Sequence, residues 1–291
     1  LNDNLNFTSK LAEDRSSILK ADPWRSFLFI FLAASTLWIF IKGKIKKQYV
    51  VITLSLLVLI DMWSVDKRYL NESHFIKENN SLIKRTSADN IILKNNPDQF
   101  RVFDLSDSRN GPFNSSRASY FHNSIGGYHA AKLMRYQDLI DNHLSQNNTS
   151  VLSMLNCGWI ITAQGEAVQS EQAGLTPLGN AWFISSVQFV ENADEEIEAL
   201  NNFNPAQTAI VDKRFDNLLQ GRKDFDKEIG AKIELDIKNY EPNHLTYTFT
   251  SPLTSDQLAI FSEIYYNKGW NAYIDGVKSS YFRANYVLRA M

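Results

Sequence analysis

The densest group of side chains that could bind a ligand lies between residues 117 and 135. It combines cations, aromatic rings and glycines: Arg117, Tyr120, His122, Gly126, Gly127, Tyr128, His129 and Arg135. The glycine pair precedes a predicted helix, and backbone N–H groups at a helix start can hold a phosphate or another anion. The basic side chains would add positive charge, and the tyrosines would stack on a sugar. This composition favours binding of a phosphorylated, sugar-bearing lipid; the alternative is a tight glycine turn packed on the core, with arginines in ordinary ion pairs.

Other chemistries find less support in the sequence. His122 and His129 stand seven residues apart without a Cys or carboxylate at ligand spacing, so we expect no metal site. The carboxylates of residues 138–141 and 194–198 are expected on solvated helix faces or in a first helical turn, where acids stabilise the helix dipole. No nucleotide-binding loop, nucleophile elbow or dinucleotide fingerprint is present. No catalytic residue can be assigned, and no cofactor is evident.

Composition places the chain among ordinary globular sequences. Hydrophobic residues make up 44% of the 291 residues and charged residues 21%, which is typical of folded domains. The net charge of −2 gives no reason to expect nucleic acid as a partner. The single cysteine, Cys157, excludes an internal disulfide framework, and we expect it to be a small core residue.

Two concentrated apolar runs, residues 24–41 and 49–63, predict a transmembrane helical hairpin over residues 24–63. Each run is close to the ~20 residues that cross a bilayer, and neither has a polar stripe. The connecting loop, residues 42–48, holds four lysines and no acid, which indicates a cytoplasmic loop. Residues 1–23 and everything after residue 63 are then extracytoplasmic. The alternative is a helical hairpin buried in a soluble protein.

Two further features of the membrane region carry predictions. Residues 7–20 read as a short amphipathic helix that lies on the outer leaflet. Asp61 is the one ionisable residue well inside an apolar run, and an intramembrane carboxylate is a candidate functional residue. Because Asp61 lies close to the outer interface, a hydrogen-bonded structural role is the alternative.

Residues 64–225 predict a mixed α/β domain built on a small sheet. Helical spacing marks residues 83–94, 128–144, 148–155 and 193–203, and strand patterns mark residues 100–105, 159–162, 182–190 and 208–211. A polar loop is expected over residues 106–116.

Residues 226–291 predict a separate β-sandwich, jelly-roll-like, for which the last strands are absent. Short β-rich runs occur at residues 233–237, 245–250, 258–264, 272–274 and 286–288, separated by turn residues. Asp275-Gly276 between two of these runs is a strong signal of a two-residue hairpin. Leu1 in place of a Met, and a strand-like last segment, predict that the chain is a piece of a longer protein. The fold class is therefore α+β with a transmembrane hairpin.

Several segments resemble YfhO-type bacterial membrane proteins, in the order in which that family has them. They are residues 117–140, 178–183, the turn 240–243, residues 262–266 leading to Gly269-Trp270, and residues 61–63 with 68–70. The resemblance covers nearly the whole chain. It implies a multi-pass protein of the cytoplasmic membrane with a C-terminal outer domain, related to glycosyltransferases that take sugars from polyprenyl-phosphate carriers. The acidic residue expected to carry catalysis in such enzymes lies in a first outer loop, which no part of this sequence matches.

The leading hypothesis is therefore an accessory, extracytoplasmic part of a lipid-linked-sugar glycosyltransferase acting on cell-envelope glycans. Its expected partners are the lipid bilayer, a polyprenyl-phosphate-linked sugar and an envelope glycan acceptor. The alternative is a non-catalytic binding or scaffold module of an envelope-assembly membrane protein. A transporter or flippase component is a third hypothesis, for which Asp61 is the one supporting residue.

Overall fold

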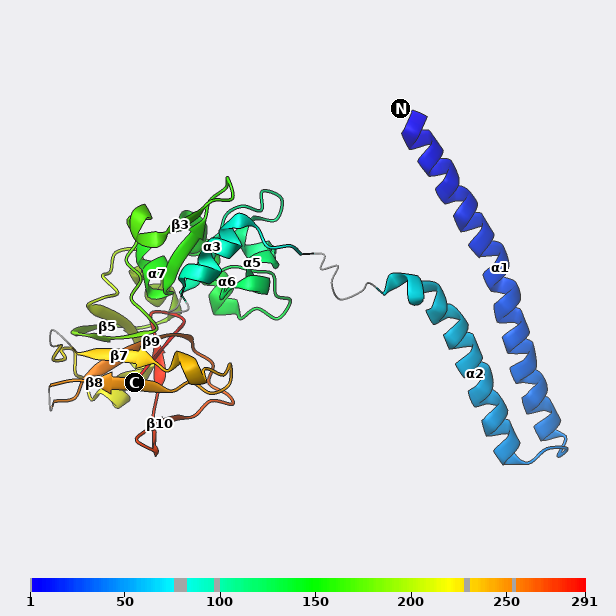
Figure 1. Ribbon diagram of the computed structural model, residues 1–291. Helices are drawn as coiled ribbons and strands as arrows, with labels where there is room; N and C mark the ends of the chain where they lie inside the picture. The colour runs from blue at the N-terminus through cyan, green and yellow to red at the C-terminus, as the bar shows by residue number, and fades with distance from the viewer. Residues whose placement is uncertain (1, 76–82, 97–99, 228–230, 253–254) are drawn as a thin grey trace. The chain divides into compact units, whose positions relative to one another are not determined.

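The computed structural model describes residues 2–75, 83–96, 100–227, 231–252 and 255–291; for residues 2–15 and 17–21 it describes the backbone alone. The chain divides into two compact units, Leu1–Leu82 and Ile83–Met291, both drawn in Figure 1. The first unit is helical and the second combines short helices with several small sheets, so the chain is a mixed α+β protein.

The first unit consists of two long helices, α1 (Asn2–Ile41) and α2 (Lys47–Tyr69), followed by the 3-10 helix η1 (Glu72–His74). The segments Asp22–Ile41 and Lys47–His74 are long and apolar enough to cross a membrane, and only 6% of each apolar window is buried. The helix expected over residues 7–20 is not separate. It is the first half of α1, which continues through Pro23.

A short turn joins the two helices. Gly43 has a φ of 69°, a left-handed conformation that glycine adopts without steric cost. Lys42 lies over the Trp38 ring, 5.7 Å from its centroid. The lysine-rich loop expected over residues 42–48 therefore begins as a turn, and its last two residues start α2.

The helices of the second unit are short. They are α3 (Ser87–Asn95), α4 (Gly111–Asn114), α5 (Arg117–Phe121), α6 (Met134–Asn142), α7 (Thr149–Met154), α8 (Ala193–Ala199) and α9 (Asp216–Leu219). Four 3-10 helices accompany them in the described residues, η2 (Leu144–Gln146), η3 (Ser170–Ala173), η4 (Lys213–Phe215) and η5 (Ile237–Asn239). The expected helix at residues 148–155 is confirmed as α7, whose N-cap Asn148 accepts a hydrogen bond from the backbone of Val151.

Two sheets form the centre of the second unit. In the first, β1 (Arg101–Asp104) pairs in parallel with β2 (Cys157–Ile161), and β2 pairs antiparallel with β3 (Ala167–Gln169). The second has the order β12-β13-β9-β4, with bounds Phe282–Ala284, Leu288–Ala290, Leu258–Ile264 and Ala181–Ile184. One core of buried apolar side chains joins these sheets to α6, α7 and the parallel pair β5–β6, with members such as Phe103, Leu139, Met154, Ile210, Ile260 and Leu288.

Three two-stranded sheets complete the unit. They are β5 (Ser186–Val190) with β6 (Thr208–Asp212), β7 (Lys232–Leu235) with β8 (Tyr247–Thr250), and β10 (Ala272–Ile274) with β11 (Val277–Ser279). The hairpin expected at Asp275-Gly276 is confirmed, because both residues have positive φ and β10 pairs with β11 around them. In Figure 1, α3, α5 and α6 lie at one end of this unit and β10 at another.

The β-rich run expected at residues 286–288 begins as a turn, and only its last residue belongs to β13. Three expectations about secondary structure between residues 106 and 190 were also wrong. The single strand expected over residues 182–190 is two strands, β4 and β5, which belong to different sheets. They separate at Ser185, whose N–H donates to the carbonyl of Gln207. The helix expected over residues 128–144 starts only at Met134. The expected loop 106–116 contains the short helix α4.

The separate sandwich expected for residues 226–291 is not confirmed. β9 pairs with β4, so the sheet contains strands from both sides of residue 225. The hairpin β7–β8 packs on this sheet through Tyr247, whose ring lies 4.9 Å from the ring of Phe261 on β9. Strands β9, β12 and β13 therefore complete the core of the preceding domain, and the β7–β8 hairpin packs on their sheet.

Candidate functional site

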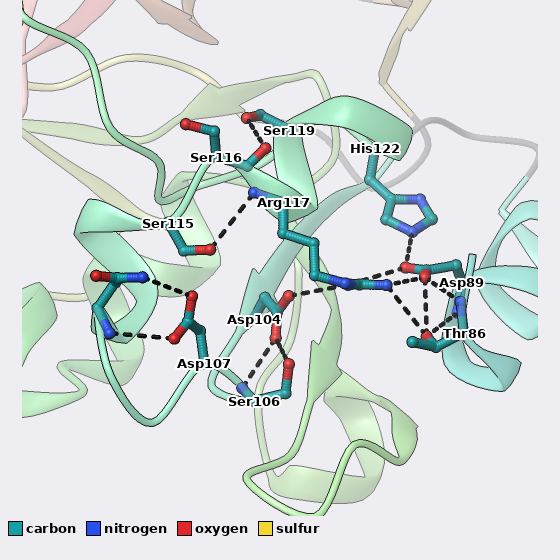
Figure 2. Close-up of polar contacts among 11 residues, drawn as sticks. Thr86, Asp89, Asp104, Ser106, Asp107, Ser115, Ser116, Arg117, Ser119 and His122 are labelled. Carbon is teal, nitrogen blue, oxygen red and sulfur yellow. Dashed lines mark hydrogen bonds and ion pairs between the residues drawn. The ribbon is translucent and has the colours of Figure 1, made fainter. Parts of the chain in front are cut away.

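Two of the predicted site residues, Arg117 and His122, meet at a buried carboxylate (Figure 2). Arg117 donates to both oxygens of Asp89, and its Nη1 lies 3.4 Å from an oxygen of Asp104. His122 Nε2 lies 3.0 Å from Asp89 Oδ1. Asp89 is fully buried. These residues, together with Thr86, are called the Asp89 cluster below.

Local sequence places each member of the Asp89 cluster. Thr86 and Asp89 form a capping box at the start of α3, in which each side chain bonds the backbone N–H of the other. Arg117 begins α5 and His122 caps its end, so this short helix presents both side chains to Asp89. Asp104 ends β1 and accepts hydrogen bonds from Ser106. The cluster therefore joins α3, α5 and β1.

The electrostatics of the cluster favour an Asp89 that is ionised at neutral pH. Burial alone would raise the pKa of this carboxyl, but hydrogen bonds from the backbone of Thr86, from Arg117, from the Thr86 hydroxyl and from His122 outweigh it. Together they lower the pKa of Asp89 from 3.8 to about 2. A carboxyl with this pKa is a poor general acid at neutral pH.

The balance of charge also argues against a phosphate at this position. One guanidinium faces two carboxylates, so the positive charge of Arg117 is already used inside the chain. An additional anion would meet Asp89 and Asp104 at the same place. These ion pairs hold α3, α5 and β1 together. They match the alternative interpretation of Arg117, in which its guanidinium forms ordinary ion pairs within the fold.

The glycine pair serves packing. A Cβ atom on Gly126 would lie 1.9 Å from the carbonyl oxygen of Pro112, so only glycine fits. Gly127 has a φ of 119° and donates its N–H to the same oxygen, at 2.9 Å. Six irregular residues separate Gly127 from Met134, where α6 begins. The expectation of a helix start directly after the glycines is therefore wrong, and the predicted anion site has no helix N-terminus at this position.

The remaining candidates of this segment lie at the surface. Tyr120, Tyr128 and His129 are exposed. The Nδ1 atom of His129 accepts a hydrogen bond from the backbone of Ala131 at 3.1 Å. A surface hollow of about 530 Å³ lies beside β5, and none of the predicted site residues line it.

Arg135 belongs to a second ionic cluster. Its Nη1 lies 3.0 Å from an oxygen of Glu196, and its guanidinium stacks 4.3 Å from the centroid of the Tyr286 ring. Arg283 lies 3.2 Å from the same oxygen and 3.7 Å from Asp212. These five residues are called the Glu196 cluster below. The structure thus places Arg117 and Arg135 in separate clusters, each with its own carboxylate.

The Glu196 cluster also holds a strained turn. Asn285 and Tyr286, between β12 and β13, both have positive φ, which costs side-chain-bearing residues about 1 kcal/mol or more. Glu196 accepts a hydrogen bond from the N–H of Tyr286, and Asn285 exchanges two hydrogen bonds with the backbone of Ile210. The turn is buried and fastens β12–β13 to β6 and α8.

Sequence patterns missed the residues that anchor both clusters. Asp89 could have been found, because Thr86-x-x-Asp89 is a capping-box spacing before an apolar run. Glu196 was expected on a solvated helix face or in a first helical turn. It lies in the first turn of α8, but its side chain is fully buried. The neighbouring residues on α8 are also acidic, and no local sequence signal distinguishes Glu196 from them.

Asp61 has a partner on the other long helix. Its carboxylate lies 3.3 Å from Arg25, which also donates to the hydroxyl of Ser64. A second ion pair, Arg68 with Asp22 at 2.9 Å, links the same two helices. These contacts match the structural alternative for Asp61, since they tie α1 to α2 at one end of the hairpin.

Cys157 is buried, and burial raises the pKa of its thiol to about 11; the prediction of a core cysteine is confirmed. Among the residues that the structure describes, no group of three or more His, Cys, Asp or Glu side chains could hold a metal ion.

Comparisons with known proteins found no match: no family model, no curated protein and no solved structure matches the chain.

Proposed function

We propose that this chain is a membrane-anchored, extracytoplasmic part of a multi-pass protein of the bacterial cytoplasmic membrane. In this proposal, the protein transfers sugar from a polyprenyl-phosphate carrier to an envelope glycan. The chain would help to seat the carrier or the acceptor, without supplying the catalytic acid.

The exposed apolar hairpin carries the membrane part of the proposal. Two helices of sufficient length and hydropathy have only 6% of their apolar windows buried, whereas a hairpin inside a soluble protein would bury these side chains. Interhelical ion pairs lie at one end, and the lysine-rich turn lies at the other. The positive charge of that turn supports a cytoplasmic loop and an outer location for Ile83–Met291.

The glycan part of the proposal rests on the resemblance to YfhO-type proteins. Within the described residues, the two clusters pair both arginines of the predicted phosphate site, Arg117 and Arg135, with buried carboxylates. This supports an accessory role, with contacts made by exposed aromatic side chains such as Tyr120 and Tyr128. The same observation favours the second candidate, a non-catalytic scaffold of envelope assembly, in which these side chains contact protein.

A cysteine-labelling experiment tests the orientation. Cys157 is buried, so a cysteine introduced at Lys44 or at Lys268 would be the reactive one. We expect a membrane-impermeant maleimide to label Lys268→Cys on intact bacteria, and Lys44→Cys only after permeabilisation. Labelling in the opposite order would refute the orientation, and release of the chain from membranes by alkaline carbonate would refute the membrane assignment.

A second experiment separates the two candidate functions. Tyr128→Ala with His129→Ala changes two exposed side chains, so folding should be retained. In the full-length protein we expect reduced envelope glycan modification at normal expression. Unchanged modification would favour the scaffold, and Lys232→Ala serves as an exposed control.

A further inference from the structure

A cluster of basic and aromatic side chains lies where the chain enters the second unit. Lys84 and Arg85 follow the first residue of that unit, and both are exposed. The Arg85 guanidinium lies 5.7 Å from the centroid of the Phe121 ring, and the Tyr120 ring lies 4.9 Å from the same ring. Lys84, Arg85, Tyr120 and Phe121 are called the basic-aromatic patch below.

The charges of this patch are available to an outside partner. Across the described ranges, neither Lys84 nor Arg85 forms an ion pair with an acidic side chain. The nearest acid of the adjacent helix, Asp89, is fully buried and paired with Arg117 and His122. Tyr120 is 62% exposed. The patch therefore presents two cations and a tyrosine ring to the solvent.

We infer that the basic-aromatic patch docks on the anionic outer surface of the bilayer that holds α1 and α2. Tyrosine is enriched at membrane interfaces because its ring is apolar and its hydroxyl is polar. Lysine and arginine next to a span are attracted by anionic headgroups. The two cations of the patch, Lys84 and Arg85, follow the end of α2 at Tyr69 by 15 and 16 residues. This inference rests on the proposed membrane location.

Docking would have a consequence for the proposed function. Tyr120 and Phe121 lie on α5, whereas Lys84 and Arg85 directly precede Thr86, the N-cap of α3. The Asp89 cluster joins both helices to β1. In this proposal, the ion pairs of the Asp89 cluster hold the patch in place on the second unit. The face that carries the patch is the one that meets the headgroups. A polyprenyl-phosphate carrier lies at this same level of the membrane, so docking would hold the domain beside its substrate.

The test uses the full chain, reconstituted in nanodiscs with and without phosphatidylglycerol, and Cys157→Ser as background. An environment-sensitive fluorophore is attached at Tyr120→Cys, and quenching by brominated lipids is measured. Tyr273→Cys is the matched control, because Tyr273 is 58% exposed and lies on β10, away from α5 in Figure 1. We expect severalfold stronger quenching at position 120, which falls when phosphatidylglycerol is omitted or salt is raised.

Charge variants make the test quantitative. Lys84→Ala with Arg85→Ala should lower the ratio of docked to undocked protein about 30-fold, or about fivefold per charge (about 1 kcal/mol). Lys232→Ala with Lys238→Ala removes two exposed lysines elsewhere and should change little.

Equal quenching at positions 120 and 273, or quenching that ignores the anionic lipid, would overturn the inference; a sugar or protein partner for Tyr120 would then be favoured. If carbonate instead releases the chain from the membrane, the proposed function itself fails. The two failures are therefore distinguishable.

Discussion

Replacing Asp89 by asparagine tests whether the buried carboxylate joins α3, α5 and β1. Asparagine has nearly the same shape and still accepts from Thr86, but its amide group would face the donors of Arg117 and His122. The pKa of Asp89 is lowered from 3.8 to about 2, which corresponds to about 2.4 kcal/mol at neutral pH. Arg117 is 24% exposed, and solvent screening reduces this ionic part to about 1–2 kcal/mol.

The unmet hydrogen bonds add about 1 kcal/mol, so Asp89→Asn should cost about 2–3 kcal/mol in total. For a unit of this size, that lowers the melting temperature by roughly 5–10 °C. Near-UV circular dichroism of the chain in detergent would measure it. Asp107→Asn is the matched control: its pKa is also about 2, chiefly because of the backbone hydrogen bond from Asn110, but its bonds stay within a surface loop. We expect only a small change there.

The pH dependence gives a second readout with a defined sign. Because the folded-state pKa of Asp89 lies below its ordinary value, the stabilisation is fully present above about pH 4. It is lost as the pH falls from 3.8 towards 2. Asp89→Asn should lack this part of the acid loss. Equal melting temperatures for wild type and Asp89→Asn, or an unchanged acid loss in the variant, would refute the reasoning.

Three further predictions follow from buried groups. Glu196→Gln removes the negative charge that compensates the buried Arg283, so it should lower the free energy of unfolding, measured with denaturant, by about 3–5 kcal/mol. Glu198 is exposed, and Glu198→Gln should change that free energy by less than about 0.5 kcal/mol. Similar losses for both variants would contradict the Glu196 cluster. His143 is buried, with Nε2 donating to the carbonyl of Ile197, and burial lowers its pKa. Stability should therefore fall as the pH drops below 6.5, and a melting series from pH 7.5 to 5 should be flatter for His143→Gln; equal slopes would argue against a neutral His143. Burial raises the pKa of Cys157 to about 11, so a thiol reagent at pH 8 should react only after unfolding, and rapid reaction of the folded chain would show that the core around β2 opens.

Local patterns were sufficient for elements whose signal lies within a few residues. The apolar runs predicted the two long helices, because a span needs only a length and a hydropathy. Strand β9 was predicted with its bounds, residues 258–264, by β-rich residues between turn signals. The hairpin at Asp275-Gly276 depends on two residues that tolerate positive φ.

Predictions failed where a distant contact overrode the local pattern. Apolar spacing extended the helix back to residue 128, but Gly126 and Gly127 pack against the backbone of Pro112 just before this segment. The strand over residues 182–190 divides because its two halves find partners in different sheets.

The candidate site depended most on tertiary structure. The sequence by itself determined which residues are cationic, aromatic or glycine between positions 117 and 135, and therefore what they could bind. Only the fold decided that Arg117 meets Asp89, 28 residues away, and that Arg135 meets Glu196, 61 residues away. Ion pairs depend on which elements pack together, and periodicity within one element carries no information about its neighbour in space.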